Sequence, residues 1–107
     1  MEVAKQETFG PVVAISPYDD LDEAVRRANA TSYGLGASVW GPEGEALREV
    51  GERMEAGMVG LNRGLSAVGG APWVGWKMSG LGHTRSVSGM RQFLQPRSLS
   101  SVRAAKK

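Results

Sequence analysis

Short apolar runs alternate with amphipathic segments in the stretch PVVAISPYDDLDEAVRRANATSYGLGASVWGPEGEALREVGERMEAGMVGL, residues 11–61. Residues 11–16 form a continuous apolar run of the kind that a parallel sheet buries on both faces. Residues 37–40 and 58–61 are two further short runs of this kind. Because the connections between the runs are short and helix-like, the stretch predicts β-α-β-α-β with parallel strands, and the fold class is α/β.

Both connecting segments carry helix signals. Asp20, with Glu23 three residues later, is a capping-box-like start. Pro42 suits the first turn of a second helix, predicted to run to about Ala56 with Gly57 as its C-terminal cap. Apolar residues at helical spacing are expected to face inward, namely Leu21, Ala24, Val25 and Ala28 in the first helix and Ala46, Leu47, Val50 and Met54 in the second.

The remainder of the chain has weaker periodicity. Residues 62–82 read as a loop rich in glycine and aromatic residues, and a loop of this length more often lines a site than merely connects elements. A last helix is predicted over about 84–94, ended by Pro96 and burying Val87, Met90 and Leu94. Residues 98–103 alternate loosely and could form a final strand.

Three motifs carry a resemblance to a known family. They are QETFGPVV (Gln6–Val13), NATSYGLGASVW (Asn29–Trp40) and APWVGWKMSGLG (Ala71–Gly82). In this order they resemble the C-terminal part of the NAD(P)-dependent aldehyde dehydrogenase superfamily, with a semialdehyde-dehydrogenase-like member as one form. The resemblance implies that residues 1–97 are the C-terminal part of a catalytic domain, and that residues 98–107 are an oligomerisation strand with a basic tail.

The residues that carry the chemistry of that family do not occur in this sequence. The family uses a cysteine thiolate as nucleophile and a nicotinamide as hydride acceptor. This chain contains no cysteine and no Gly-x-Gly-x-x-Gly loop, so no residue is assigned a catalytic role. The interpretation is a C-terminal fragment of an enzyme that oxidises an aldehyde to a carboxylate, with NAD or NADP in the full-length parent. The chain alone is expected to bind neither cofactor and to be inactive.

Two alternatives to a severed fragment remain open. The chain could be an independent, non-catalytic assembly or binding module that docks on the sheet edge of a partner. The upstream part of the enzyme could instead be supplied by a separate chain.

The resemblance assigns two residues to the cofactor side. Glu7 matches the glutamate that accepts hydrogen bonds from the nicotinamide ribose hydroxyls, and a carboxylate can accept both protons. Phe9 matches the aromatic residue that packs near the nicotinamide ring. The alternative interpretation is a solvent-exposed acid and a core phenylalanine ahead of a strand.

The substrate side would come from the long loop. Trp73 occupies the position of an aromatic residue that lines the aldehyde tunnel. Ala67 falls where relatives carry a larger aromatic residue or, in succinate-semialdehyde dehydrogenases, a serine that helps to bind the substrate carboxylate, and alanine can do neither. Arg63 and Ser66 are nearby polar candidates, although a loop arginine is usually just solvated.

Three departures from the motif of the family stand out. Val74 replaces the first of two glycines, so that part of the loop is expected to bend differently. His83 and Thr84 replace the usual Arg-Glu pair, and Gln95 stands where many members carry a glutamate that pairs with the arginine. As the only histidine, His83 is interpreted as structural, and no metal site is expected.

Composition narrows the class of protein. The chain has 107 residues, 41% of them hydrophobic, and a net charge of +2. No run approaches the roughly 20 apolar residues of a membrane span, and no export signal is seen, so a cytoplasmic location is expected. Basic residues near the end lack the pattern of a nucleic-acid surface. Self-association is expected instead, because the family covers these helices and strand edges with segments that this chain lacks.

Overall fold

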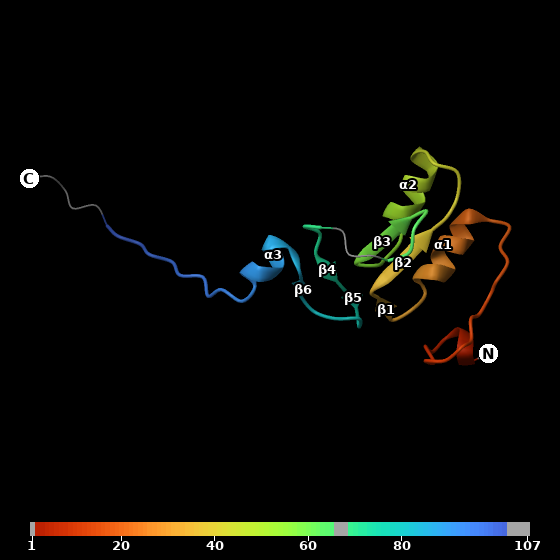
Figure 1. Cartoon of the computed structure of the whole chain (residues 1–107), viewed down its shortest axis with the longest axis horizontal. Coiled ribbons are helices and arrows are strands. Elements are labelled where there is room, and N and C mark those ends of the chain that lie inside the picture. Colours follow the sequence, from red (N-terminus) through yellow and green to blue (C-terminus); the bar gives the residue numbers. More distant parts are fainter. Residues whose placement is uncertain (1, 66–68, 103–107) are drawn as a thin grey trace, which may run out of the picture.

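The computed structural model, which describes residues 2–65 and 69–102, consists of short helices and short strands (Figure 1). A 3₁₀ turn at Glu2–Ala4 precedes them. The elements are α1 (Leu21–Asn29), β1 (Tyr33–Gly34), β2 (Gly36–Val39), α2 (Glu45–Glu52), β3 (Met58–Leu61), β4 (Trp73–Val74), β5 (Trp76–Lys77), β6 (His83–Thr84) and α3 (Ser86–Arg91).

The centre of the fold is a parallel β-α-β unit. Strands β2 and β3 pair in parallel, with Ala37 opposite Val59 and Val39 opposite Leu61, and α2 forms the connection between them. The structure thus confirms the predicted strands at 37–40 and 58–61 to within one residue, together with their parallel direction. Figure 1 shows α1 and α2 beside this pair of strands.

The start of α1 is also confirmed. The Asp20 carboxylate accepts hydrogen bonds from the backbone N–H groups of Asp22 (3.2 Å) and Glu23 (3.3 Å), which would otherwise have no partner in the first turn. Residue Val25 of the predicted stripe is buried, whereas Leu21 stays 44% exposed. The stripe faces an open apolar groove of about 490 Å³ between α1 and α2, to which Leu47, Val50 and Met54 also contribute.

The predicted strand at 11–16 is wrong for the described chain. The segment has no strand pairing, and Val12, Val13 and Ile15 are 62%, 79% and 87% exposed. A strand exists only where a neighbour supplies the other half of the hydrogen-bond ladder, and neither β2 nor β3 pairs with this segment. The apolar run therefore lies on the surface as an extended segment.

Helix α2 is shorter than predicted. It spans Glu45–Glu52 instead of running from Pro42 to Ala56, and Arg53 rather than Gly57 is its C-terminal cap. Of the residues expected to face inward, Leu47 is buried while Ala46 is exposed. Gly57 instead lies in the turn into β3, where its N–H donates to the Gly34 carbonyl (2.9 Å).

The segment 62–82 is not wholly loop. It contains β4 and β5, which form antiparallel pairs with β6 and β1 respectively, each only two residues long. Val74 belongs to β4 opposite His83, and its backbone is not in the left-handed region. A β-branched residue fits here because a paired, extended strand suits it.

The C-terminal prediction is wrong in extent and in burial. Helix α3 covers only Ser86–Arg91 of the predicted 84–94, and Val87, Met90 and Leu94 are 69%, 70% and 69% exposed. Residues 98–102 form no strand, and residue 103 lies outside the described part. Figure 1 shows the segment after α3 running away from the remaining elements.

The interior is small. Among the described residues, only Val25, Leu47 and Ala56 form a buried hydrophobic core. The chain exposes 9398 Å², against about 5,800 Å² expected for a folded monomer of its mass. No helix in the described ranges is long and apolar enough to cross a bilayer.

Candidate functional site

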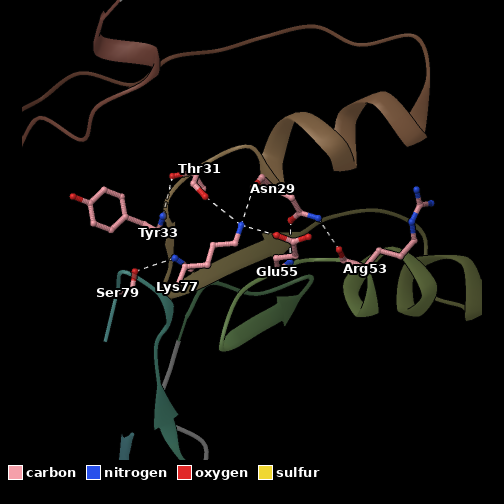
Figure 2. A network of polar contacts seen from close by, with 8 residues as sticks. Asn29, Thr31, Tyr33, Arg53, Glu55, Lys77 and Ser79 are labelled. Atoms are coloured by element: carbon pink, nitrogen blue, oxygen red, sulfur yellow. Dashed lines mark hydrogen bonds and ion pairs between the residues drawn. The ribbon is translucent and has the colours of Figure 1, made fainter. Parts of the chain in front are cut away.

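A network of polar contacts fastens the second and third motifs together (Figure 2). The Lys77 ammonium of β5 donates to the backbone carbonyls of Asn29 (2.7 Å) and Thr31 (3.2 Å) and forms an ion pair with the Glu55 carboxylate (2.7 Å). The N–H of Gly34 donates to the Ser79 hydroxyl (2.9 Å). The loop that carries Trp73 is thereby tied to the end of α1 and to β1.

The Asn29 side chain completes this network. Its amide donates to the Arg53 carbonyl (2.8 Å), and its oxygen accepts from the Glu55 N–H (2.9 Å). One side chain at the end of α1 thus holds the turn after α2, which also presents Glu55 to Lys77. We did not single out Asn29, Lys77 or Ser79 from the sequence, although all three lie inside the quoted motifs.

The two cofactor-side candidates lie on the N-terminal segment. Glu7 is exposed and lines a shallow pocket of about 300 Å³ to which Thr31 and Tyr33 also contribute. Phe9 is 96% exposed, so the alternative of a core phenylalanine does not hold in this structure. A carboxylate facing an open pocket can accept hydroxyl protons, and an uncovered aromatic ring can stack on a planar group.

The substrate-side candidates are placed less completely. Trp73 is half-buried in β4 and lines a cavity of about 360 Å³ together with Leu35, His83 and Phe93. Ala67 and Ser66 lie outside the described residues. The structure does not bring Glu7 and Trp73 to one cavity, since the two pockets share no lining residue.

His83 has a structural environment. Its Nε2 lies 2.9 Å from the Ser88 hydroxyl, and its backbone N–H donates to Oε1 of Gln92 (3.2 Å), whose amide donates back to the His83 carbonyl. Gln92 is thus the partner of the His83 backbone in this structure. No three His, Cys, Asp or Glu side chains in residues 2–65 and 69–102 are grouped to hold a metal ion.

Arg85, for which the sequence predicts no role, has an unusual position. Its guanidinium carbon lies 4.7 Å from the centroid of the Trp73 ring, which is cation–π geometry. Its backbone has φ 57° and ψ 178°, a region that is essentially restricted to glycine and costs other residues about 1–3 kcal/mol. A positive φ at a non-glycine residue is not visible in sequence.

Comparison with known proteins identifies the origin of this arrangement. The model of the aldehyde dehydrogenase family matches residues 1–99. The chain is 39% identical to a protein of Mycobacterium ulcerans that is named as a putative NADP-dependent succinate-semialdehyde dehydrogenase. The match covers 96% of this chain and 20% of that protein. The chain spans about a fifth of the length of the curated relatives that it matches.

Solved structures agree with the sequence match. One is a variant of aldehyde dehydrogenase C from Pseudomonas syringae bound to NAD+ and octanal, with 45% identity and a TM-score of 0.82 over 89% of this chain and 19% of that one. Another is the succinate-semialdehyde dehydrogenase of Burkholderia pseudomallei, with 41% identity and a TM-score of 0.80 over 87% of this chain and 19% of that one. The small α/β arrangement therefore corresponds to one segment of these larger proteins.

Proposed function

The chain belongs to the aldehyde dehydrogenase family, and on that premise we propose that it is the C-terminal part of an NAD(P)-dependent enzyme that oxidises an aldehyde to a carboxylate. The observation that carries the proposal is the family match over residues 1–99, which includes all three motifs. The network around Lys77 supports it, because it holds two of these motifs in contact across the loop that carries Trp73.

The residues of this chain limit the roles that it can have in such an enzyme. This chain contains no cysteine, so the nucleophile has to come from residues other than these 107. We propose that Glu7 accepts hydrogen bonds from the ribose hydroxyls of the nicotinamide cofactor and that Phe9 packs beside its ring. The cofactor, when bound, accepts the hydride that leaves the substrate. The exposed Glu7 and Phe9 fit such a partner, but no glycine-rich phosphate loop accompanies them in the sequence.

Trp73 would form the substrate side together with Ala67, which lies outside the described residues. The indole offers a broad apolar wall to the carbon chain of an aldehyde. The named relatives include proteins for succinate semialdehyde and one bound to octanal, so an acidic and a long apolar aldehyde are both candidates.

A chimera tests this proposal. The chain replaces the corresponding segment of the Pseudomonas syringae aldehyde dehydrogenase C with its cysteine intact, and reduced nicotinamide is followed by absorbance during octanal oxidation. Turnover within about tenfold of the unmodified enzyme is expected if this segment does the same work, since tenfold corresponds to about 1.4 kcal/mol of barrier. A folded chimera that binds NAD+ but does not turn over would contradict the proposal.

The purified chain alone is predicted to show no aldehyde oxidation with NAD or NADP. A water molecule or hydroxyl in place of the thiolate would lack both the activated nucleophile and the positioned hydride acceptor. Absorbance of reduced nicotinamide should stay at the buffer level with acetaldehyde and with octanal. Any growth that depends on both the aldehyde and the chain would refute this prediction.

A second candidate function is that of a non-catalytic assembly module. The exposed surface favours it, because the excess over a compact monomer, about 3,600 Å², is more than twice the about 1,600 Å² that a standard interface buries. The exposed large apolar side chains lie on the segment 11–16 and on α3, and also at Phe9, Leu81, Leu99 and Val102.

Self-association of the purified chain is the corresponding prediction. Sedimentation velocity should show a mass that rises with concentration, because the exposed apolar side chains and unpaired strand edges can be covered by another copy. Addition of urea below the unfolding midpoint should weaken the association. A single compact monomer over a hundredfold range of concentration would rule it out.

A further inference from the structure

The pair formed by Arg85 and Trp73 is more than a surface contact. Strand β6 places Thr84 opposite Trp73, and Arg85 follows directly, with its guanidinium 4.7 Å from the indole centroid. The backbone of Arg85 adopts the glycine-like conformation described above. Such a conformation persists only where the surroundings determine it, so the fold holds the backbone of Arg85 at this place, and the contact with the indole positions the guanidinium.

The guanidinium has no carboxylate partner within the described ranges 2–65 and 69–102, where the ion pairs involve Arg27, Arg53 and Lys77 instead. The distribution of charge explains this. All eleven acidic residues lie at or before Glu55. The basic residues that follow are Arg63, Lys77, Arg85, Arg91, Arg97, Arg103, Lys106 and Lys107. The chain after Glu55 therefore carries basic side chains and no acidic ones.

The geometry leaves Arg85 able to bind a carboxylate while it stays on the ring. A guanidinium that contacts an indole uses its face, and its N–H donors point outward in its own plane, where a carboxylate can accept two of them. Beside it, Trp73 lines the cavity of about 360 Å³ with Leu35 and Phe93 as further apolar walls. Arg85 is not among the residues that line this cavity, but it lies against the Trp73 ring, so an apolar chain that follows the indole brings an anionic end to the guanidinium.

We propose that Arg85 and Trp73 form a subsite that selects aldehydes carrying a carboxylate at the end distant from the carbonyl. The inference rests on the proposed function, because that function makes Trp73 a substrate-lining residue.

The first arm of the test uses the 107-residue chain and needs no activity. Trp40→Phe and Trp76→Phe leave Trp73 as the only tryptophan, and its fluorescence is quenched by iodide and by neutral acrylamide at constant ionic strength. The ratio of iodide to acrylamide quenching should fall about two- to threefold in Arg85→Gln, because the local positive charge is lost. The quenching ratio should stay unchanged in Arg85→Lys. It should also stay unchanged in the matched control Arg91→Gln, since Arg91 is an exposed arginine on α3.

Succinate and its neutral analogue succinamide then serve as probes of the same fluorescence. Succinate should act at about tenfold lower concentration than succinamide, and Arg85→Gln should remove the difference. The proposal is overturned if the two probes act alike, or if Arg91→Gln has the effect of Arg85→Gln. Far-UV circular dichroism shows whether a variant has kept its fold, and Arg85→Lys, which preserves the charge, decides the case if Arg85→Gln has not.

The second arm uses the chimera and compares kcat/KM for succinic semialdehyde and butanal. Arg85→Gln should lower the ratio of the two about tenfold and leave butanal little changed. An inactive chimera would contradict the proposed function. The fluorescence experiments on the 107-residue chain would still test the subsite. An active chimera with an unchanged ratio would defeat the subsite and leave the function in place.

Discussion

Gly57→Ala is expected to lower the free energy of unfolding of the chain by about 3 kcal/mol, the upper end of the usual cost of overpacking. A β-carbon built on Gly57 would lie 2.1 Å from the carbonyl oxygen of Val74 and 2.7 Å from its carbonyl carbon. Both atoms are backbone, so no side-chain rotation can relieve the clash. Either β4 has to move away, or the hydrogen bond from Gly57 N–H to the Gly34 carbonyl has to break.

Gly64→Ala is the matched control. A β-carbon at Gly64 would meet no atom within 4 Å, and Gly64 is not among the residues with positive φ. Its effect should stay within about 0.5 kcal/mol. Urea unfolding followed by circular dichroism, at concentrations below self-association, gives both values from the transition midpoints. Equal midpoints for the two variants would mean that the approach of β4 to Gly57 does not exist in solution.

Gly57 also illustrates where sequence reasoning reached its limit. A glycine after an amphipathic segment is a common helix cap, and the pattern predicts this role for Gly57. In the structure α2 ends at Glu52, and Gly57 is needed because the backbone of β4 passes close to it. The approach joins residues that are far apart in sequence and leaves no periodic trace.

The elements that were predicted correctly are those whose cause is local. Helix α1 has its cap at Asp20 and its apolar stripe within a few residues of one another, and β2 and β3 are short apolar runs joined by a helix. The segment 11–16 has the same apolar character as β2. It remained outside a sheet because pairing depends on a neighbouring strand, which no local pattern can supply.

In the candidate site, too, the sequence predicted some residues and not the contacts between them. The motifs identified Trp73 and Glu7 as residues of interest, and they also contained Lys77 and Ser79, whose contacts join segments more than 40 residues apart. The role of Arg85 was not predictable, since it depends on the pairing of β4 with β6 and on a positive φ. Sequence therefore located the motifs, while the contacts between them required the fold.

In the chimera, Trp73→Ala is expected to lower kcat/KM for octanal roughly ten- to hundredfold and to change the value for acetaldehyde by less than about threefold. The reason is that removal of the indole deletes contacts that only a long carbon chain can reach. Trp40→Ala is the matched control, because Trp40 is 68% exposed and lines the α1–α2 groove rather than the cavity of Trp73. The control should leave the ratio of octanal to acetaldehyde unchanged.

Glu7→Gln should act on the other reactant. The amide keeps the shape of the side chain but loses the charge and one acceptor, so hydrogen bonds to the ribose hydroxyls weaken and the nicotinamide is held less well. The rate of hydride transfer should fall about tenfold or more for octanal and acetaldehyde alike, measured as single-turnover absorbance, while Glu2→Gln leaves it unchanged. The ratio of the values for octanal and acetaldehyde separates the substrate role of Trp73 from the cofactor role of Glu7. A Trp73→Ala variant that slows both aldehydes equally, or a Glu7→Gln variant that changes their ratio, would show that these residues do not divide substrate and cofactor between them.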